Sequence, residues 1–396
     1  MTGSGPRRWA ALGGPTGDPP QALAVAAQHV AAQRCFHLPR AGSQAAALEI
    51  FAQLDADLRR GWAVAGFWSY ELGAALELPG YSAGAEGDAE WICFDPKHLQ
   101  RVVLPAPPQP WQRAFPPLPA DLAGQGPAYR RSAAEVLEKI RAGEVYQVNL
   151  TAQAALPFGG WPDALAALAA VQAVQSVPYA AVFQGARHQL ICGSMERFLS
   201  VRGQQVSSRP IKGTAPRHAD PAQDAAQAQA LRQAPKERAE NTMIVDMVRN
   251  DLQRAAVPGS VQVIEMLETV GYATLWHLES EVAAQLAEPG QLGSLLRATL
   301  PPASVTGCPK IQAMRVIAQL EGRRRGPYCG ALGVAFPDGS ADLAVAIRTL
   351  WLDGQTARFG VGAGLVADSE PEAEWAETCL KAQSPLAILQ LLRGGQ

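Results

Sequence analysis

Residues 208–217 read Ser-Arg-Pro-Ile-Lys-Gly-Thr-Ala-Pro-Arg, and the rest of the chain can be interpreted outward from this stretch. Its two prolines fix the backbone angle φ and disfavour helix, while Gly213 permits unusual backbone angles. The stretch therefore predicts a rigid, non-repetitive turn that presents Lys212. Arg209 and Arg217 flank this lysine, and two nearby cations favour a neutral amine, which is the nucleophilic form. The local alternative is an ordinary solvated lysine on a surface turn.

Composition excludes several classes of protein. The chain has 396 residues, of which 48% are hydrophobic and 18% charged, as in folded soluble proteins. A formal net charge of −2 argues against general binding to nucleic acid or anionic membranes. No apolar run approaches the roughly 20 residues of a membrane-spanning helix, and the first residues lack a signal-peptide pattern. The six cysteines form no C-x-x-C pair, which argues against a disulfide framework and a zinc site. These features predict a cytoplasmic protein.

Hydrophobic periodicity predicts helices and strands with no regular βαβ repeat. The expected helices cover residues 21–34, 43–60, 129–142, 222–233, 236–250, 291–298, 310–321 and 372–392. The expected strands cover residues 62–68, 91–94, 99–104, 144–151, 179–184, 188–192, 198–202, 204–209, 260–265, 330–335, 341–352 and 356–361. Groups of strands interrupted by helices predict an α+β fold with mainly antiparallel sheets.

Proline and glycine density predicts how the chain is divided. Residues 1–20 are rich in both and are expected to be loosely ordered. The proline-dense tract at residues 105–127 predicts a connector without regular structure. We therefore expect a partly ordered, interleaved N-terminal region at residues 1–115 and a catalytic domain at residues 120–396.

Two pairs of carboxylates are candidates for metal binding. Glu237 and Glu240 are three positions apart on one expected helix, as are Glu374 and Glu377 on another, so each pair shares a helix face. Opposing faces of this kind could hold Mg²⁺ through oxygen ligands. The alternative is that each pair is a solvated helix face.

Three further residues are candidates for chemistry. Glu196 lies sixteen positions before Lys212, and a pair of strands between them could bring both side chains into one pocket. Taken alone, Glu196 is better explained as an exposed glutamate at a strand end. His277 alone is typical of a hydrogen-bonded core histidine, and Arg348 of a strand arginine with a structural partner.

These residues lie in tracts that resemble the motifs of the chorismate-utilising enzymes. The tracts are Ser-Met-Glu-Arg-Phe (194–198), Pro-Ile-Lys-Gly-Thr (210–214), His-Leu-Glu-Ser-Glu-Val (277–282), Ser-Val-Thr-Gly-Cys-Pro-Lys (304–310), Ala-Ile-Arg-Thr (346–349) and two longer tracts at 236–252 and 362–378. Two further tracts, at 66–73 and 143–150, resemble family segments; the first of them is structural rather than catalytic in the family. Within the family, the lysine at position 212 is most similar to component I of the aminodeoxychorismate synthases, because anthranilate synthases have alanine there.

The resemblance implies a fold of mainly antiparallel sheets packed as a β-sandwich with surrounding helices. It also implies that Lys212 attacks C2 of chorismate, that Glu196 is the general acid and that His277 lies in the active site. Glu240 and Glu377 would bind Mg²⁺ directly, with Glu237 and Glu374 in or near its first water shell. The implied substrate contacts are Thr306, Gly307, Tyr328, Arg348, Gly362, Ala363, Gly364 and Lys381.

The implied reaction joins chorismate and ammonia to give 4-amino-4-deoxychorismate, which leads to p-aminobenzoate and folate. No glutaminase pattern is present, so we expect a separate glutamine amidotransferase subunit to supply ammonia. Two alternatives within the family are an anthranilate synthase component I and an isochorismate or salicylate synthase. A third alternative is a catalytically silent subunit that only binds its partner or a metabolite.

Overall fold

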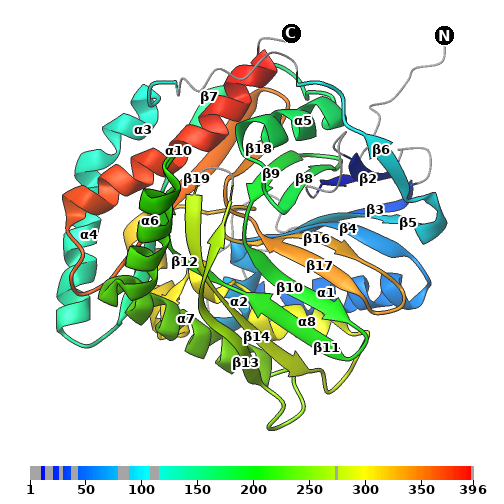
Figure 1. Cartoon of the computed structure of the whole chain (residues 1–396). Helices are drawn as coiled ribbons and strands as arrows, with labels where there is room; N and C mark the ends of the chain where they lie inside the picture. Colours follow the sequence, from blue (N-terminus) through cyan, green and yellow to red (C-terminus); the bar gives the residue numbers. More distant parts are fainter. Residues whose placement is uncertain are drawn as a thin grey trace.

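The computed structural model describes residues 10–13, 21–25, 30–36, 43–78, 89–107, 116–272 and 275–393. Two antiparallel sheets dominate it (Figure 1). The nine-stranded sheet contains, in spatial order, β15 (Gly307–Cys308), β7 (Gln147–Pro157), β19 (Thr356–Leu365), β18 (Thr349–Leu352), β9 (Gln189–Ser194), β8 (Tyr179–Gln184), β1 (Ala10–Gly13), β2 (Gln21–Val25) and β6 (Gln100–Val103).

The ten-stranded sheet lies beside it in Figure 1. It contains, in spatial order, β12 (Ile211–Pro216), β14 (Leu275–Gln285), β11 (Gln205–Arg209), β10 (Arg197–Arg202), β17 (Ala341–Val345), β16 (Ala331–Ala335), β4 (Ala63–Trp68), β5 (Ala89–Phe94) and β3 (Val30–Phe36), with β13 (Gln262–Gly271) paired to β14. The neighbouring strands in both sheets run antiparallel, which confirms the predicted α+β fold class.

Helices pack around the two sheets. They are α1 (Ser43–Arg59), α2 (Tyr70–Glu77), α3 (Ala120–Gly124), α4 (Gly126–Arg141), α5 (Ala164–Val174), α6 (Pro221–Gln233), α7 (Pro235–Gln253), α8 (Leu292–Thr299), α9 (Lys310–Glu321) and α10 (Pro371–Arg393), with short 3₁₀ turns η2 (Pro96–His98) and η3 (Ala303–Val305). Helix starts follow the sequence: the Asp163 and Asp220 side chains accept backbone N–H groups at the first turns of α5 and α6. Helix α10 packs on β19 and α7 packs on β14, so each sheet carries one of the two carboxylate-bearing helices.

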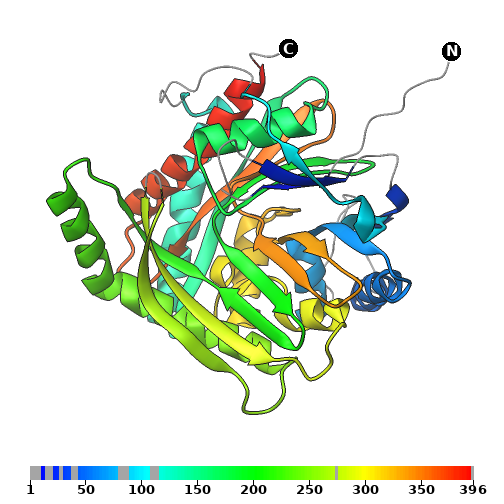
Figure 2. The same ribbon diagram turned by 45° about the vertical axis from the view of Figure 1, so that its right-hand side comes forward.

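One large apolar core joins both sheets and most of the helices. A much smaller cluster of Leu231, Leu267 and Leu278 lies between α6 and the strands β13 and β14. Figure 2 shows α6 at the outer margin of the molecule, beside the end of the ten-stranded sheet. Helix α6 is therefore held by far less buried apolar surface than the rest of the fold.

The N-terminal strands are distributed over both sheets. Strands β1, β2 and β6 belong to the nine-stranded sheet, and β3, β4 and β5 to the ten-stranded sheet. Within the described residues, no helix is long and apolar enough to cross a membrane.

The helix predicted over residues 21–34 is wrong. Its ends form β2, which pairs with β1 and β6, and β3, which pairs with β5; residues 26–29 lie outside the described part. Alanine favours helix in isolation, but here pairing within both sheets decides the backbone. Of the loosely ordered stretch expected at 1–20, residues 10–13 form β1 and the others lie outside the described part.

Other elements differ from the prediction in smaller ways. The connector expected at 105–127 contains α3 and the start of α4, while its residues 108–115 lie outside the described part. Helix α5 was not predicted, because its sequence is apolar on nearly all sides and has little helical periodicity. Strand β14 was not predicted either, and the single strand expected at 341–352 is two strands, β17 and β18, in different sheets.

Candidate active site

A hairpin brings Glu196 and Lys212 together. Strands β10 and β11 pair so that Arg197 lies opposite Arg209, which places the residue before β10 beside the residues that follow β11. The Lys212 charge acts on the Glu196 carboxyl, and the backbone N–H of Ile211 donates to it. This agrees with the expectation that a strand pair brings the two residues near each other, whereas the pocket described below is lined by Glu196 and not by Lys212.

The prediction of a non-repetitive turn at Lys212 is wrong, because this residue lies on β12. Strand β12 pairs with β14, with a shift of register between Ile211 and Thr214. Gly213 has a φ of 85°, a backbone angle that glycine adopts readily, and it lies within this irregularity. The stretch is an irregular edge strand, and its two prolines made the sequence resemble a turn.

The two flanking arginines do not act on Lys212 as predicted. Arg209 donates to Glu265, Glu279 and Glu281, at 2.6, 2.7 and 2.8 Å. Arg217 is bonded to Asp224 and lies over the Trp276 ring. Both cations are therefore neutralised by carboxylates of their own, which the prediction from the flanking charges did not include.

Lys212 instead faces a set of carboxyl groups and the nine-stranded sheet. Its charge acts on Glu196, Glu237, Glu240 and Glu377. A methyl group added at Gly364 would lie 3.3 Å from Lys212 Nζ, so β12 of one sheet and β19 of the other approach each other here. The lysine therefore sits between the two sheets and among acidic groups.

Glu196 has the environment of a general acid. Its residue is 4% exposed, and burial raises the pKa of its carboxyl to about 7, against the opposing effects of Ser304 and Lys212. A carboxylic acid with a pKa near neutrality keeps its proton in a substantial fraction of molecules at the pH where it must donate it.

Glu196 and Arg348 both lie where the chain passes from one sheet to the other. Glu196 separates β9 from β10, and Arg348 separates β17 from β18. Backbone hydrogen bonds join the two crossings: Val345 N donates to Glu196 O and Gly193 N to Arg348 O, each at 3.1 Å. The two crossings thus fix the acid and the arginine relative to each other.

Arg348 is held in an uncommon conformation. Its φ of 51° lies in the left-handed region, and its guanidinium donates to the backbone oxygen of Lys381. Burial lowers the pKa of Arg348, while the nearby Tyr328 and Glu377 act in the opposite direction. A strained arginine in a polar site is typical of residues that bind an anion.

His277 lies close to the same cations. Its Nδ1 is 3.1 Å from Thr214 Oγ1, and its Nε2 has no hydrogen-bond partner within the described part of the chain. Burial lowers the pKa of His277 to about 4, and the charges of Arg348 and Lys381 act in the same direction. The ring is therefore neutral at physiological pH and has one nitrogen available to a ligand.

Backbone groups of β19 complete one wall of the site. Strand β18 pairs with β19 only at residues 357–359, so Gly362, Ala363 and Gly364 lie beyond its end and have β7 as their strand neighbour. Lys381 Nζ donates to Gly362 O at 3.0 Å. On an antiparallel strand every second residue directs its N–H and C=O away from its neighbour, so this side of β19 can offer backbone N–H groups to a carboxylate ligand.

Thr306 and Gly307 lie on the far side of β7 from these residues. Asn149 N donates to Thr306 O at 2.8 Å, and Gly307 pairs with Val148. The Thr306 hydroxyl donates to Pro302 O at 2.8 Å and is fully buried. Their position next to β7 agrees with a substrate-binding role without testing it.

The two carboxylate pairs face each other across the site, from α7 and α10. Burial raises the pKa of Glu237, and it raises that of Glu240 to about 7. Glu374 lies 3.3 Å from Lys236 Nζ and Glu377 lies 2.5 Å from Lys381 Nζ. Burial opposes ionisation of Glu377, but Lys381 and Lys212 bring its pKa below the usual value.

The donor chemistry of these four carboxylates fits Mg²⁺, which binds oxygen ligands and keeps several waters. Within the described ranges, however, no three histidine, cysteine, aspartate or glutamate side chains converge on one point as a preformed metal site. Lys236 and Lys381 hold the α10 carboxylates instead. The predicted Mg²⁺ site therefore stays a prediction, and it requires these lysine pairs to open.

Strand β7 adds two polar residues, Gln147 and Asn149, for which the sequence predicts no role. Gln147 Oε1 and Asn149 Nδ2 are buried without a hydrogen-bond partner in the described chain. A methyl group at Gly364 would lie 2.6 Å from Gln147 Nε2, so this amide lies close to the Lys212 site. Buried polar atoms normally have hydrogen-bond partners, so these two side-chain atoms are suited to bind a ligand or a water molecule. The alternation of Gln147 and Asn149 with Val148 and Leu150 is a signal that the sequence contained.

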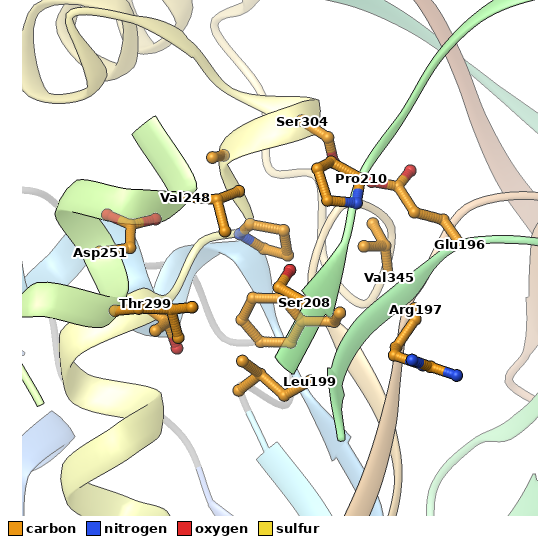
Figure 3. Close-up of a pocket in the computed structure, with 14 residues that line it drawn as sticks. Glu196, Arg197, Leu199, Ser208, Pro210, Val248, Asp251, Thr299, Ser304 and Val345 are labelled. Atoms are coloured by element: carbon orange, nitrogen blue, oxygen red, sulfur yellow. The ribbon is translucent and has the colours of Figure 1, made fainter. Parts of the chain in front are cut away.

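A small pocket adjoins the site without coinciding with it (Figure 3). Glu196 is the only one of the predicted site residues among its lining residues. Figure 3 labels Glu196, Ser304 and Pro210 near one end of this pocket and Asp251 near the other. The catalytic geometry is therefore better defined by the contacts of Lys212 than by this pocket.

Comparisons with known proteins agree with the motifs. A family model described as chorismate binding enzyme matches residues 18–387. Aminodeoxychorismate synthase of Streptomyces pristinaespiralis is 43% identical over 270 residues, covering 68% of this chain and 37% of that protein. Aminodeoxychorismate synthase component 1 of Klebsiella aerogenes is 39% identical over 262 residues, covering 66% of this chain and 58% of that protein.

A relative with another reaction is almost as similar. Anthranilate synthase component 1 of Streptomyces coelicolor is 37% identical over 281 residues, covering 69% of this chain and 54% of that protein. Among solved structures, anthranilate synthase component I from Streptococcus pneumoniae superposes with a TM-score of 0.73 at 25% identity, covering 98% of this chain and 94% of that chain. The chain thus spans from about a third to little more than half of the length of these curated relatives.

Proposed function

Because the chain belongs to the chorismate-binding enzymes, we propose that it acts as component I of an aminodeoxychorismate synthase. This activity converts chorismate and ammonia into 4-amino-4-deoxychorismate. The more similar curated relatives carry this name, whereas an anthranilate synthase is only slightly less similar. The choice between the two therefore depends on the residues of the site.

The observation that carries the proposal is the position of Lys212. Its side chain lies between β12 and β19, where it interacts with Glu196 and approaches Gly364. An amine at this place can reach a substrate held by the β19 amides, and it has an acid beside it. Anthranilate synthases, which have alanine here, need no such nucleophile.

The proposed reaction begins from the deprotonated form of Lys212, whose amine attacks C2 of chorismate. The ring double bonds shift, the C4–O bond breaks, and the Glu196 proton goes to the departing hydroxyl, which leaves as water. Ammonia then adds at C4, the double bonds shift back, and the C2–N bond to Lys212 breaks. Glu196 takes the proton that the incoming ammonia loses, so both side chains return to their initial states.

Anchoring of the substrate carboxylates makes this attack intramolecular in effect. Arg348 and the amides of Gly362, Ala363 and Gly364 provide one anchoring surface, with Thr306 and Gly307 beyond β7 and Lys381 and Tyr328 close to Arg348. His277, which is neutral, can offer Nε2 as a hydrogen-bonding group. A bound Mg²⁺, held by Glu240 and Glu377 with Glu237 and Glu374 nearby, would neutralise carboxylate charge on the substrate.

Ammonia is expected to come from a separate glutamine amidotransferase subunit, and the product to serve p-aminobenzoate and folate synthesis. The name "component 1" of the Klebsiella relative supports a two-component enzyme. The isolated chain should then use ammonium salts but not glutamine. Rapid use of glutamine by the rigorously purified chain would contradict a separate amidotransferase.

Product analysis tests the proposal directly. The purified chain is incubated with chorismate, MgCl₂ and ammonium chloride at pH 8, and products are separated and identified by mass spectrometry. Formation of 4-amino-4-deoxychorismate supports the proposal. Anthranilate as the main product would favour the second candidate, an anthranilate synthase, and isochorismate would indicate a water-adding enzyme of the same fold.

A further inference from the structure

The motif Ser69-Tyr70-Glu71-Leu72-Gly73 lies far from Lys212 in sequence, yet it contacts the turn that follows α9. Glu71 is completely buried and accepts Arg325 N at 2.7 Å and Gly326 N at 3.0 Å with its two oxygens. Tyr70 N donates to Gly326 O at 3.1 Å. Three hydrogen bonds therefore attach the start of α2 to residues 325 and 326.

The side chain of Arg325 extends from this turn to η3 and β7. Its guanidinium lies 4.5 Å from the centre of the Tyr70 ring and forms a two-point ion pair with Glu321, at 2.7 and 3.0 Å. It also donates to Val305 O at 2.9 Å and to Asn149 O at 2.6 Å. Its side chain is 1% exposed, so all these contacts are shielded from water.

These two carbonyl groups belong to the elements that carry substrate-binding residues. Val305 immediately precedes Thr306 and Gly307, whereas Asn149 lies on β7 opposite Gly364 of β19. Glu321 also accepts the backbone N–H and the hydroxyl of Thr151, which lies opposite Gly362. Arg325 and its partner Glu321 thus join the loop before β15 to β7, the strand beside β19 in the same sheet.

The same motif meets the start of this loop. A methyl group at Gly73 would lie 2.3 Å from Pro301 N and 2.5 Å from the carbonyl carbon of Leu300. Only glycine allows α2 to approach so closely the segment that leads into η3. The motif therefore contacts the loop at 300–307 both directly and through Arg325.

Simple stabilisation explains this arrangement poorly. A fully buried ion pair contributes little net stability compared with apolar side chains of similar volume, because both charges must be desolvated. A guanidinium with five fixed donors, in contrast, sets the direction and spacing of the groups that it contacts. Here it fixes two backbone carbonyls from different elements.

We propose that Glu71 and Arg325 are positioning residues that hold the Thr306–Gly307 loop against β7 in the geometry that binds the substrate carboxylate. Glu71 orients the 325–326 turn, and Arg325 orients the loop. The identity of the ligand as chorismate rests on the proposed function. The N-terminal motif, for which the family resemblance implies a structural role, would then determine substrate affinity.

The test compares Glu71→Gln with the matched control Glu90→Gln. Glutamine keeps the size of the side chain but replaces one acceptor oxygen by a donor, so one of the two turn N–H groups loses its partner. Glu90 is equally buried, lies on β5 and accepts Gln33 Nε2 at 2.8 Å and the N–H of Ala186, with no contact to the 300–307 loop among the described residues. Both variants should lose thermal stability.

Only Glu71→Gln should alter the substrate site. We expect its KM for chorismate to rise about tenfold or more with kcat within about threefold of the wild type, since a tenfold loss corresponds to about 1.4 kcal/mol of ground-state binding. Glu90→Gln should keep KM within about twofold at a temperature well below its melting point. Equal KM values for the two variants, at equal loss of Tm, would overturn the proposal.

Hydrogen exchange gives a second readout that needs no substrate. In the wild type, the N–H groups of Val305 and Thr306 donate to Pro302 O and Ala303 O. Peptides covering residues 302–309 should exchange faster in Glu71→Gln than in Glu90→Gln. Unchanged exchange would refute the positioning role whatever the enzyme's reaction, whereas failure of the wild type to convert chorismate would refute the proposed function alone.

Arg325→Lys serves if Glu71→Gln fails to fold. Lysine keeps the positive charge beside Glu321 but cannot contact two carbonyls in fixed geometry. We expect faster exchange over 302–309 and the same rise in KM. A lysine variant with wild-type KM and exchange would show that charge alone suffices and would contradict a role for the guanidinium fork.

Discussion

Helices α7 and α10 carry matching pairs of glutamates, but only the pair on α10 forms direct ion pairs with lysines. On α10, each carboxylate has a lysine partner, Lys236 for Glu374 and Lys381 for Glu377. On α7, Glu237 and Glu240 form no ion pair with any described residue, and burial raises the pKa of both carboxyl groups. The α10 pair is neutralised by the protein itself, while the α7 pair still needs a cation.

This difference indicates how a divalent ion would enter the site. The α7 carboxylates have no direct ion-pair partner among the described residues, so they would gain most from binding a cation. The α10 carboxylates must exchange lysine for metal, which lowers their net gain. Lys212 lies between the two pairs and acts on three of the four carboxylates, so it compensates part of the charge in the absence of metal.

The largest expected effect is that of Lys212→Ala. Removing the nucleophile should lower formation of 4-amino-4-deoxychorismate by about a thousandfold or more, because the covalent route is lost. Lys212→Arg is the matched control: it keeps the cation between α7 and α10 but its guanidinium stays protonated, so it should not restore activity. Steady-state assays with excess ammonium measure both variants.

A covalent adduct would support the same role. Wild-type enzyme incubated with chorismate and Mg²⁺ without ammonia should show a chorismate-derived mass on the peptide that contains Lys212. An alanine variant with undiminished activity would remove Lys212 from the mechanism. Activity in the arginine variant alone would reduce its role to electrostatic compensation.

The next effect concerns the carboxylates themselves. Glu240→Gln and Glu377→Gln should each lower turnover by about a hundredfold or more at saturating Mg²⁺, since each removes a charged oxygen ligand. Glu138→Gln on α4, whose side chain is 73% exposed, should retain full activity and serves as control. Near-normal turnover in both active-site variants would show that the metal assignment is wrong.

In the absence of metal, substitutions on the two helices should change the melting temperature in opposite directions. The folded-state pKa of Glu240 is about 7 and its usual value is 4.5, so the folded chain binds more protons between these pH values and loses stability as pH rises through that window. In the presence of chelator at pH 8, Glu240→Gln should therefore raise Tm by about 2 °C or more, and the gain should vanish below about pH 4.5.

Glu374→Gln should do the opposite under the same conditions. Glu374 Oε1 accepts the Ser369 hydroxyl at 2.6 Å and pairs with Lys236, so the variant weakens existing contacts. Differential scanning calorimetry of both variants with EDTA measures the two shifts. Shifts of the same sign would remove the asymmetry between α7 and α10.

The smallest expected effect is that of Lys236→Gln. The Lys236 side chain is 40% exposed, so its ion pair contributes little to stability. If this lysine competes with Mg²⁺ for Glu374, its removal should lower the half-saturating Mg²⁺ concentration about two- to threefold. A higher requirement for Mg²⁺ in this variant would show that the lysine assists metal binding instead.

The sequence predicted the residues of the site better than their backbone. Lys212 and Glu196 lie near the same end of a hairpin, as expected, because pairing of adjacent strands is a local feature set by alternation along the chain. The turn at Lys212 was wrongly predicted because β12 is defined by its pairing with β14, some sixty residues later, and local composition contains no such information.

Charge partners were also beyond the reach of the sequence. Arg209 and Arg217 lie within five residues of Lys212 in the chain, but their side chains pair with Glu279 of β14 and Asp224 of α6. The sequence alone does not show that these two elements pack beside them. The buried Arg325 was missed for the same reason, since its partners come from α2, β7, α9 and η3. In contrast, the helical spacing of the four glutamates was sufficient to place them on α7 and α10.

The crossings at Glu196 and Arg348 limit how this chain can change in evolution. Each crossing is a short link between two strands. The number of residues in the link decides which side chains of the next strand face the core. An insertion or deletion of one residue there would turn the following strand over, exposing its core side and burying its other side. New reactions on this scaffold should therefore arise by replacing side chains at constant length, and loop-length variation among relatives should avoid both links.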